Sequence, residues 1–174
     1  MGYVQLTILN TVDFVEKEIK NLIDKVKRCA RDVYNELGEG WPECVYQKAM
    51  EVALRENKIT YETQRILPIS FKGHIVGESK PDLVVWLRRP NKKRLAIVID
   101  LKWEPYFKQD HQTQILKYIQ ELKKQVKKNE EVFDTGFVIN FVKGKVNQKL
   151  ESEKEKEIVK ERVKILEAQI WDKK

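Results

Sequence analysis

The chain has 174 residues, 41% hydrophobic, with seven Gly and five Pro, which suits one domain with a buried core and excludes a disordered or fibrous chain. Lys and Arg outnumber Asp and Glu by 34 to 27, a net charge of +7 that fits nucleic-acid binding and a plain solvated surface equally well. Two cysteines exclude a disulfide scaffold, and neither a secretion signal nor a ~20-residue apolar run is present. We therefore expect an intracellular, cytoplasmic protein that does not cross a membrane. Its 35% of charged residues, mostly Lys and Glu, are also typical of heat-tolerant proteins.

The N-terminal part is predicted to form a strand and two helices. Residues Tyr3–Leu9 alternate apolar and polar side chains, which predicts a strand. Apolar residues then recur at helical spacing over 14–37, and two glycines directly after this run end the helix. Pro42 opens a second helix that runs to about Asn57.

Strand-like runs dominate the middle of the chain. We expect them at Thr60–Phe71, His74–Leu87 and Arg94–Leu101, with turn residues between them. A helix from about Gln109 to Lys128 follows, and a buried strand over Val132–Phe141 closes the core. This order predicts an α/β (α+β) fold in which helices flank a central mixed sheet.

The C-terminal end has two interpretations. Residues Lys143–Lys164 are dense in Lys and Glu, with Glu-to-Lys pairs three residues apart that favour an exposed helix. Val163–Trp171 fits either the apolar stripe of that helix or a strand, and periodicity does not choose between them. We expect one domain over 1–174, with its core at about 26–142 and a charged helical extension over 143–174.

Two aspartates are predicted to face each other in the sheet. The loop between the second and third strand runs is centred near Asn91, and a hairpin symmetric about it pairs residues whose numbers sum to about 182. Asp82 then lies opposite Asp100, with Cβ atoms ~4.5–5.5 Å apart, and Lys102 shares their face. Both faces of these strands are otherwise apolar, so the two carboxylates repel each other and lose hydration. A divalent cation, Mg²⁺ or Mn²⁺, would compensate; a structural Asp–Lys pair is the alternative.

Other polar residues could join this pair. Glu43 lies in the first turn of the second helix, where the helix dipole favours a carboxylate by ~0.3–1 kcal/mol. On the later helix His111, Gln114 and Tyr118 share one face, as they would on any amphipathic helix with a polar edge. The hairpin loop is basic, which fits contacts with a nucleic-acid backbone or a plain soluble turn. Its cations are Arg88, Arg89, Lys92, Lys93 and Arg94.

Together these residues resemble a known nuclease pattern. Pro81-Asp82 followed by Asp100-x-Lys102 resembles the PD-(D/E)xK nuclease superfamily. Gly40-x-x-Glu43-x-x-Tyr46 is similar to the signature of its GxxExxY branch, and Gln114-x-x-x-Tyr118 resembles an accessory motif of RecB-like nucleases. Further matches are Gln64, Ile66, Ile69, Lys72-Gly73, Gly77, His111 and Ile139-Asn140-Phe141.

The resemblance covers about 26–141 and has two departures. Asp100 stands where the branch usually has Glu, and Lys80-Pro81 replaces its usual Arg-Ala before the aspartate. The first departure stays within the Asp/Glu alternation of the superfamily, so metal ligation should survive it.

The resemblance implies a restriction-endonuclease-like αβββαβ core and hydrolysis of phosphodiester bonds by a metal-activated water. Asp82 and Asp100 would ligate Mg²⁺ or Mn²⁺ with the Leu101 carbonyl, and Glu43 would hold a second metal or a metal-bound water. Lys102 would orient the attacking water and stabilise charge on the phosphate. Gln114, Tyr118 and His111 would position nucleic acid or support the ligands. Gln64 would position nucleic acid.

These expectations favour a metal-dependent nuclease that acts on single- or double-stranded DNA in repair, recombination or nucleic-acid processing, as a monomer or a homodimer. The alternative is a non-catalytic module that binds nucleic acid or a partner protein on a nuclease-like fold. Retention of Glu43, Asp82, Asp100 and Lys102 argues against that alternative. A structural or assembly protein would rest on the charged C-terminal segment alone.

Overall fold

Helices and strands alternate through the residues that the computed structural model describes, which are 2–90, 93–142 and 163–170, with the backbone alone for 2–14. The helices are α1 (Gly2–Leu37), α2 (Glu43–Glu56) and α3 (Gln109–Lys123). The strands are β1 (Thr60–Thr63), β2 (Leu67–Phe71), β3 (His74–Ser79), β4 (Leu83–Arg88), β5 (Arg94–Lys102), β6 (Glu130–Val132), β7 (Thr135–Phe141) and β8 (Val163–Gln169).

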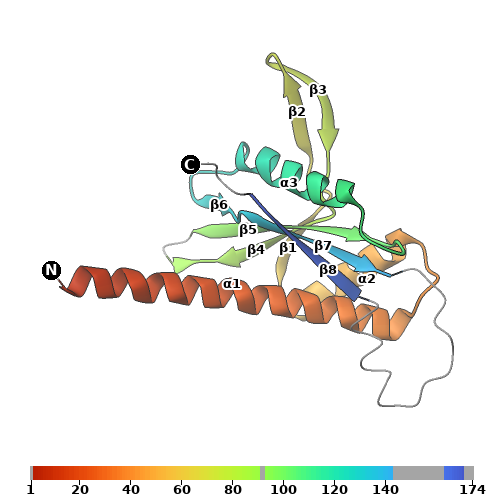
Figure 1. The fold of residues 1–174 in the computed structure, drawn as a ribbon, viewed down its shortest axis with the longest axis horizontal. Helices are drawn as coiled ribbons and strands as arrows, with labels where there is room; N and C mark the ends of the chain where they lie inside the picture. Colours follow the sequence, from red (N-terminus) through yellow and green to blue (C-terminus); the bar gives the residue numbers. More distant parts are fainter. Residues whose placement is uncertain (1, 91–92, 143–162, 171–174) are drawn as a thin grey trace.

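A central mixed sheet divides the molecule into layers (Figure 1). Its strand order is β1-β4-β5-β7-β8, and β6 pairs with β5 beside this path. Strand β5 runs parallel to β6 and β7, whereas the other pairs are antiparallel. Helices α1 and α2 cover one face of the sheet and α3 covers the other. Strands β2 and β3 form a separate two-stranded arm that projects away from this body (Figure 1).

The hairpin of β4 and β5 lies at the centre and contributes to two cores. Its pairs run from Leu83 opposite Ile99 to Arg88 opposite Arg94, which confirms the predicted register. Alternate side chains of the hairpin enter the core under α1 and α2 or the core under α3. Because both faces are covered, a polar group at the end of this hairpin loses much of its contact with water.

The packing of α3 against β7 is close. A Cβ atom added at Gly136 would lie 2.6 Å from Cγ1 of Ile115, so the absence of a side chain there lets the helix approach the strand. This helix covers the end of the sheet that carries Asp100.

The predicted N-terminal strand at Tyr3–Leu9 is wrong, because these residues belong to α1. The seven-residue run satisfies two periods at once: its apolar residues alternate, but Val4, Ile8 and Val12 are also four residues apart. The helical pattern continues without a break to Leu37, so the longer helix incorporates the short run.

The first two predicted strand runs are each interrupted. Gln64, with φ of 48°, ends β1 before the arm begins, and Pro81, which has no N–H for a ladder, separates β3 from β4. The predicted strand over Val132–Phe141 is likewise divided between β6 and β7. These breaks place the arm between β1 and β4 as an excursion from the sheet.

The remaining predictions concern the end of α3, the C-terminal residues and membrane-spanning helices. Helix α3 ends at Lys123, earlier than the predicted Lys128. The strand interpretation of the C-terminal residues is confirmed, since β8 pairs antiparallel with β7. The predicted charged helix lies mostly in 143–162, outside the described residues. Across the part of the chain that the structure describes, no helix has the length and apolar character needed to cross a membrane.

Candidate active site

Two aspartates meet where β4 begins and β5 ends. Asp100 lies in β5 with 1% of its surface exposed, and Asp82 stands directly before β4. The backbone N–H of Leu101 donates a hydrogen bond of 2.8 Å to Oδ2 of Asp82, so this carboxylate turns toward the end of β5. The structure therefore brings together the two carboxylates that the hairpin symmetry predicts as neighbours.

Gln64 holds the other oxygen of Asp82. Its Nε2 donates to Oδ1 of Asp82 at 2.9 Å, and its backbone N–H donates to the Asp82 carbonyl at 3.2 Å. Gln64 adopts a left-handed backbone with φ of 48°, a conformation that costs a residue with a side chain ~1 kcal/mol or more. Gln64, which the resemblance assigned to nucleic-acid positioning, thus contacts a candidate metal ligand instead.

Lys102 provides the positive charge beside the pair. Its Nζ lies 2.8 Å from Oδ2 of Asp100, and only 17% of its side chain is exposed. Oδ2 of Asp100 is itself buried. The two carboxylates outnumber the Lys102 ammonium, and a bound cation would balance the remaining negative charge.

The electrostatics of the cluster follow from burial and from its excess of acids. Burial, and then the charge of Asp82, raise the pKa of Asp100 from 3.8 to about 7, against the opposing effect of Lys102. Burial alone would lower the pKa of Lys102, but the charges of Asp100, Asp82 and Glu43 outweigh it and raise that pKa. The lysine therefore stays charged. The two aspartates repel each other, and a bound cation would reduce that repulsion.

Glu43 lies within electrostatic reach of this cluster. Burial raises its pKa, Lys102 lowers it, and Asp82 and Glu104 raise it further. Within the described residues, however, no three His, Cys, Asp or Glu side chains are close enough to hold an ion by themselves. Mg²⁺ is typically held by one or two carboxylates, with water and substrate oxygens completing its shell. The Asp82–Asp100 pair fits this requirement, and Glu43 lies further out.

Helix α3 contributes a second polar group of residues. Nε2 of Gln114 donates to the Tyr118 hydroxyl at 2.6 Å, and burial together with the nearby Asp100 charge raises the pKa of Tyr118. His111 is buried, and its Nδ1 accepts a hydrogen bond of 3.3 Å from the backbone N–H of Lys108. Gln114 and Tyr118 thus lie near Asp100, whereas His111 helps to hold the beginning of the helix and places its Nε2 3.5 Å from Glu104.

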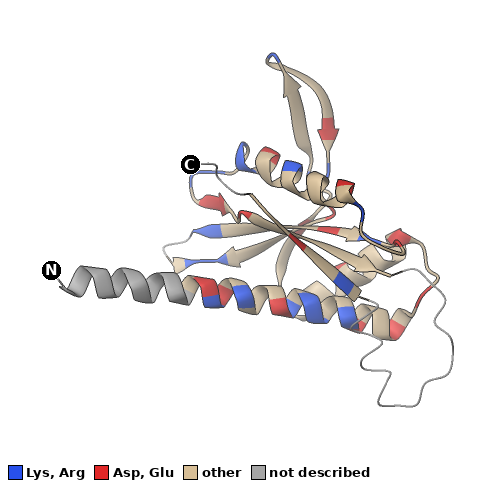
Figure 2. Cartoon of the chain, in the orientation of Figure 1, with Lys and Arg blue, Asp and Glu red and all other residues tan. Residues whose placement is uncertain are grey.

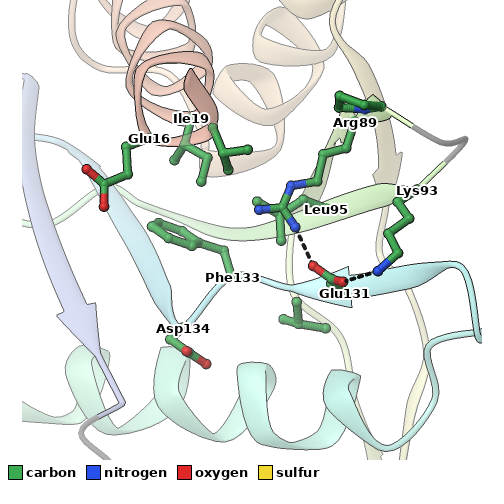
Figure 3. Close-up of a pocket in the computed structure, with 11 residues that line it drawn as sticks. Glu16, Ile19, Arg89, Lys93, Leu95, Glu131, Phe133 and Asp134 are labelled. Carbon is green, nitrogen blue, oxygen red and sulfur yellow. Dashed lines mark hydrogen bonds and ion pairs between the residues drawn. The ribbon is translucent and has the colours of Figure 1, made fainter. Parts of the chain in front are cut away.

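The basic hairpin loop lies at the opposite end of β4 and β5. At ~3.3 Å per residue, Arg88 is on the order of 20 Å from Asp82. Arg89 and Lys93 both pair with Glu131, as Figure 3 shows, and line a pocket of about 540 Å³ beside α1. Figure 2 shows blue Lys and Arg at the loop ends of β4 and β5, with the acidic residues of β6 in red beside them. The structure thus does not bring these cations to the carboxylates, and Lys92 lies outside the described residues.

Comparison with protein families decides the identity at the level of the superfamily. The family model for the PD-(D/E)XK nuclease superfamily matches residues 20–153. The chain belongs to the PD-(D/E)XK nuclease superfamily. This superfamily is nuclease-type and hydrolytic, its members typically use divalent metals, and the mixed α/β fold with its central mixed sheet is consistent with it. Comparisons with curated proteins and with solved structures give no match.

Two further residues of this PD-(D/E)XK protein, Asn140 and Glu104, shape the site, although the sequence alone gave them no role there. Asn140, in β7, is fully buried; its Oδ1 accepts the N–H of Glu104 at 2.9 Å, and its Nδ2 donates to the Glu104 carbonyl at 2.9 Å. These bonds fix the segment after Lys102. The available signals were a single amide side chain within the apolar run of β7 and the resemblance of Ile139-Asn140-Phe141 to the nuclease pattern.

The residues of the Gly40-x-x-Glu43-x-x-Tyr46 motif have distinct structural places. Gly40 has φ of 101°, which only glycine adopts readily, and lies in the loop before α2. The Tyr46 hydroxyl donates to the Gly38 carbonyl at 2.8 Å, and its ring stacks on Phe141 with centroids 4.8 Å apart. Tyr46 therefore anchors the loop that leads to Glu43.

Proposed function

We propose that the chain is a Mg²⁺- or Mn²⁺-dependent nuclease that hydrolyses phosphodiester bonds in DNA, in repair, recombination or nucleic-acid processing. The observation that carries this proposal is the buried Asp100 beside the half-buried Asp82, with the Lys102 ammonium 2.8 Å from the Asp100 carboxylate. A stable fold gains little from a buried acid beside a second acid, because burial and their mutual repulsion oppose folding. A function that needs the pair explains its presence.

We also place the chain in the GxxExxY branch, with a RecB-like Gln114-x-x-x-Tyr118 motif. Support comes from the joint position of these motifs around the carboxylates. The charge of Asp82 helps to raise the pKa of Glu43, and the charge of Asp100 helps to raise the pKa of Tyr118. In this assignment α2, β1, β4, β5, α3 and β7 form the αβββαβ core. The arm of β2 and β3 is then an insertion within that core.

The proposed roles follow from the position and charge of each group. Asp82 and Asp100 would hold the metal with the Leu101 carbonyl, and Glu43 would hold a water or a second ion at the edge of the site. When bound, a divalent cation supplies Lewis-acid chemistry, lowering the pKa of a coordinated water and neutralising charge on the phosphate. The Lys102 ammonium, kept charged by its acidic neighbours, would orient the attacking water and attract a phosphate oxygen.

The charge of the cluster supports a requirement for metal in substrate binding. Four carboxylates gather here, and the cations beside them are Lys102 and Lys108, the latter paired with Glu104 at 2.5 Å. A phosphate approaching this excess of negative charge is repelled. Binding of nucleic acid at the site should therefore be weak until a divalent cation occupies it.

The direct test is cleavage of end-labelled single-stranded, duplex and branched DNA, and of RNA, with Mg²⁺, Mn²⁺ or EDTA. We expect cleavage of DNA only with metal, and a loss of at least ~100-fold in Asp82→Asn, Asp100→Asn and Lys102→Ala. Lys117→Ala, which removes an exposed cation from α3, is the matched control and should cleave at the parental rate. Parental cleavage by Lys102→Ala would contradict the assignment, and metal-independent binding without cleavage would favour the non-catalytic module.

A further inference from the structure

Exposed aromatic side chains gather on the segments that carry the candidate site. Among the described residues, the large aromatic side chains with the greatest exposure are Trp41 at 49%, Phe71 at 62% and Tyr106 at 65%. Trp41 precedes Glu43 by two residues, and Tyr106 follows Glu104 by two. Phe71 lies further away, near the tip of the arm. Tyr and Trp side chains are enriched at interfaces, where an apolar ring and a polar atom meet the partner together.

Trp41 and Tyr106 border the same group of carboxylates. A residue two positions along the chain has its Cα within about 8 Å of the reference Cα, so both aromatic residues begin close to an acid of the cluster. The charge of Glu104 raises the pKa of Glu43, and Asn140 fixes the Glu104 backbone through two hydrogen bonds. The loop before α2 and the loop after β5 also lie at the same end of the sheet (Figure 1).

The Trp41 ring is already held in place. Its indole N–H donates to the Leu37 carbonyl at 2.9 Å, at the end of α1. The fixed φ of Pro42 constrains the backbone directly after Trp41 in the chain. A flat apolar surface that is ordered before binding loses little conformational entropy when a ligand stacks on it.

The charges between the two rings favour nucleic acid over a protein as their partner. A protein surface that covered both Trp41 and Tyr106 would also bury the acids of Glu43 and Glu104, at a large desolvation cost. A nucleic acid would place its phosphate at the cation site and its bases over the rings. Bases within a continuous duplex are stacked on one another, however, so only unpaired bases offer a free face.

We propose that Trp41 and Tyr106 form a stacking platform for unpaired bases beside the scissile phosphate. The substrate is then a single strand, or the unpaired part of a branched DNA, rather than a continuous duplex. This inference rests on the proposed nuclease function and specifies its substrate class. Stacking on one aromatic ring changes affinity by about 5- to 100-fold per base.

The test is the affinity of the full chain, with Ca²⁺ present, for a dye-labelled 20-nucleotide single strand and for the matched duplex. Trp41→Ala and Trp41→Phe both lose the bond to Leu37, so the difference between them reports the ring alone. Tyr106→Ala and Tyr106→Phe form the second pair. Val52→Ala, which truncates an exposed apolar residue nine positions beyond Glu43 on α2, is the surface control.

We expect each alanine variant to bind the single strand about 5- to 100-fold more weakly and the duplex within twofold of the parent. Both phenylalanine variants and Val52→Ala should bind as the parent does, and melting temperatures should confirm that all variants fold. Equal affinity of the alanine variants and the parent for the single strand would overturn the inference, as would an equal loss on duplex. A dimer that becomes a monomer in Trp41→Ala, seen by light scattering, would also overturn it, because a second copy would then cover the rings.

The outcome separates this inference from the proposed nuclease function. If the parent cleaves DNA with metal and the alanine variants cleave the single strand equally well, the platform is wrong and the nuclease assignment stands. If the alanine variants lose single-strand affinity but neither the parent nor any variant cleaves with metal, the platform stands and the nuclease function is wrong.

Discussion

The stability of the metal-free protein should depend on pH through Asp100. Its pKa is about 7 in the folded chain, raised by burial and by Asp82, and about 3.9 when unfolded. The folded state therefore binds this proton more tightly, so protonation of Asp100 favours folding. That contribution is complete below about pH 4 and is lost as pH rises through about 7. The shift corresponds to at most about 4 kcal/mol, against a typical total of about 5–15 kcal/mol.

The perturbation that isolates this effect is Asp100→Asn, which removes the titrating group and keeps its shape. Urea unfolding in EDTA at intervals from pH 4.5 to 8.5 gives the free energy of unfolding of the parent and the variant. We expect the parent to lose about 2–3 kcal/mol relative to Asp100→Asn between pH 5 and pH 8, because the difference cancels other titrating groups. Asp32→Asn, at an exposed position on α1, should instead follow the parent across the range.

A difference between the parent and Asp100→Asn that stays constant from pH 5 to pH 8 would refute this reasoning. It would mean that Asp100 ionises near its ordinary pKa and is neither buried nor crowded by Asp82. Addition of Mg²⁺ at pH 8 should restore stability to the parent but not to the variant, because only the parent offers both carboxylates to the cation.

Other predictions test the packing and the support of the site. Gly136→Ala should lower the free energy of unfolding by about 1–3 kcal/mol, because its Cβ would collide with Ile115; an unchanged urea midpoint would contradict the close packing. Tyr46→Phe should cost about 1 kcal/mol in the same assay, since it loses the bond to Gly38 but keeps the stacked ring; a loss above about 3 kcal/mol would show that the hydroxyl does more than this. Gln64→Ala should weaken Mn²⁺ binding about 10- to 100-fold in calorimetry, and undiminished affinity would mean that Gln64 does not orient Asp82.

The central hairpin was predictable because local rules determine it. Alternating apolar residues assign each side chain of β4 and β5 to a face, and a loop centred near Asn91 sets which residues pair. The position of Asp82 beside Asp100 follows from those two facts alone. The distance of Arg88 from the carboxylates follows too, since the loop and the aspartates occupy opposite ends of the same strands.

Features that depend on tertiary contacts were not predictable. The run Tyr3–Leu9 fits two periods, and its helical state comes from continuity with the residues after it. The bond of Gln64 to Asp82 requires a left-handed backbone at a residue that gives no local signal for one. Asn140 is an isolated amide in an apolar strand, and only the fold shows that its partner is the backbone of Glu104.

The central claim is that Asp82 and Asp100 together hold a divalent cation. Calorimetric titration of the full chain with Mn²⁺ at pH 8 tests it most directly, in the parent and in the Asp82→Asn and Asp100→Asn variants. We predict a saturable site in the parent and its loss, or at least ~100-fold weaker binding, in both variants. Parental Mn²⁺ affinity in either variant would contradict the claim.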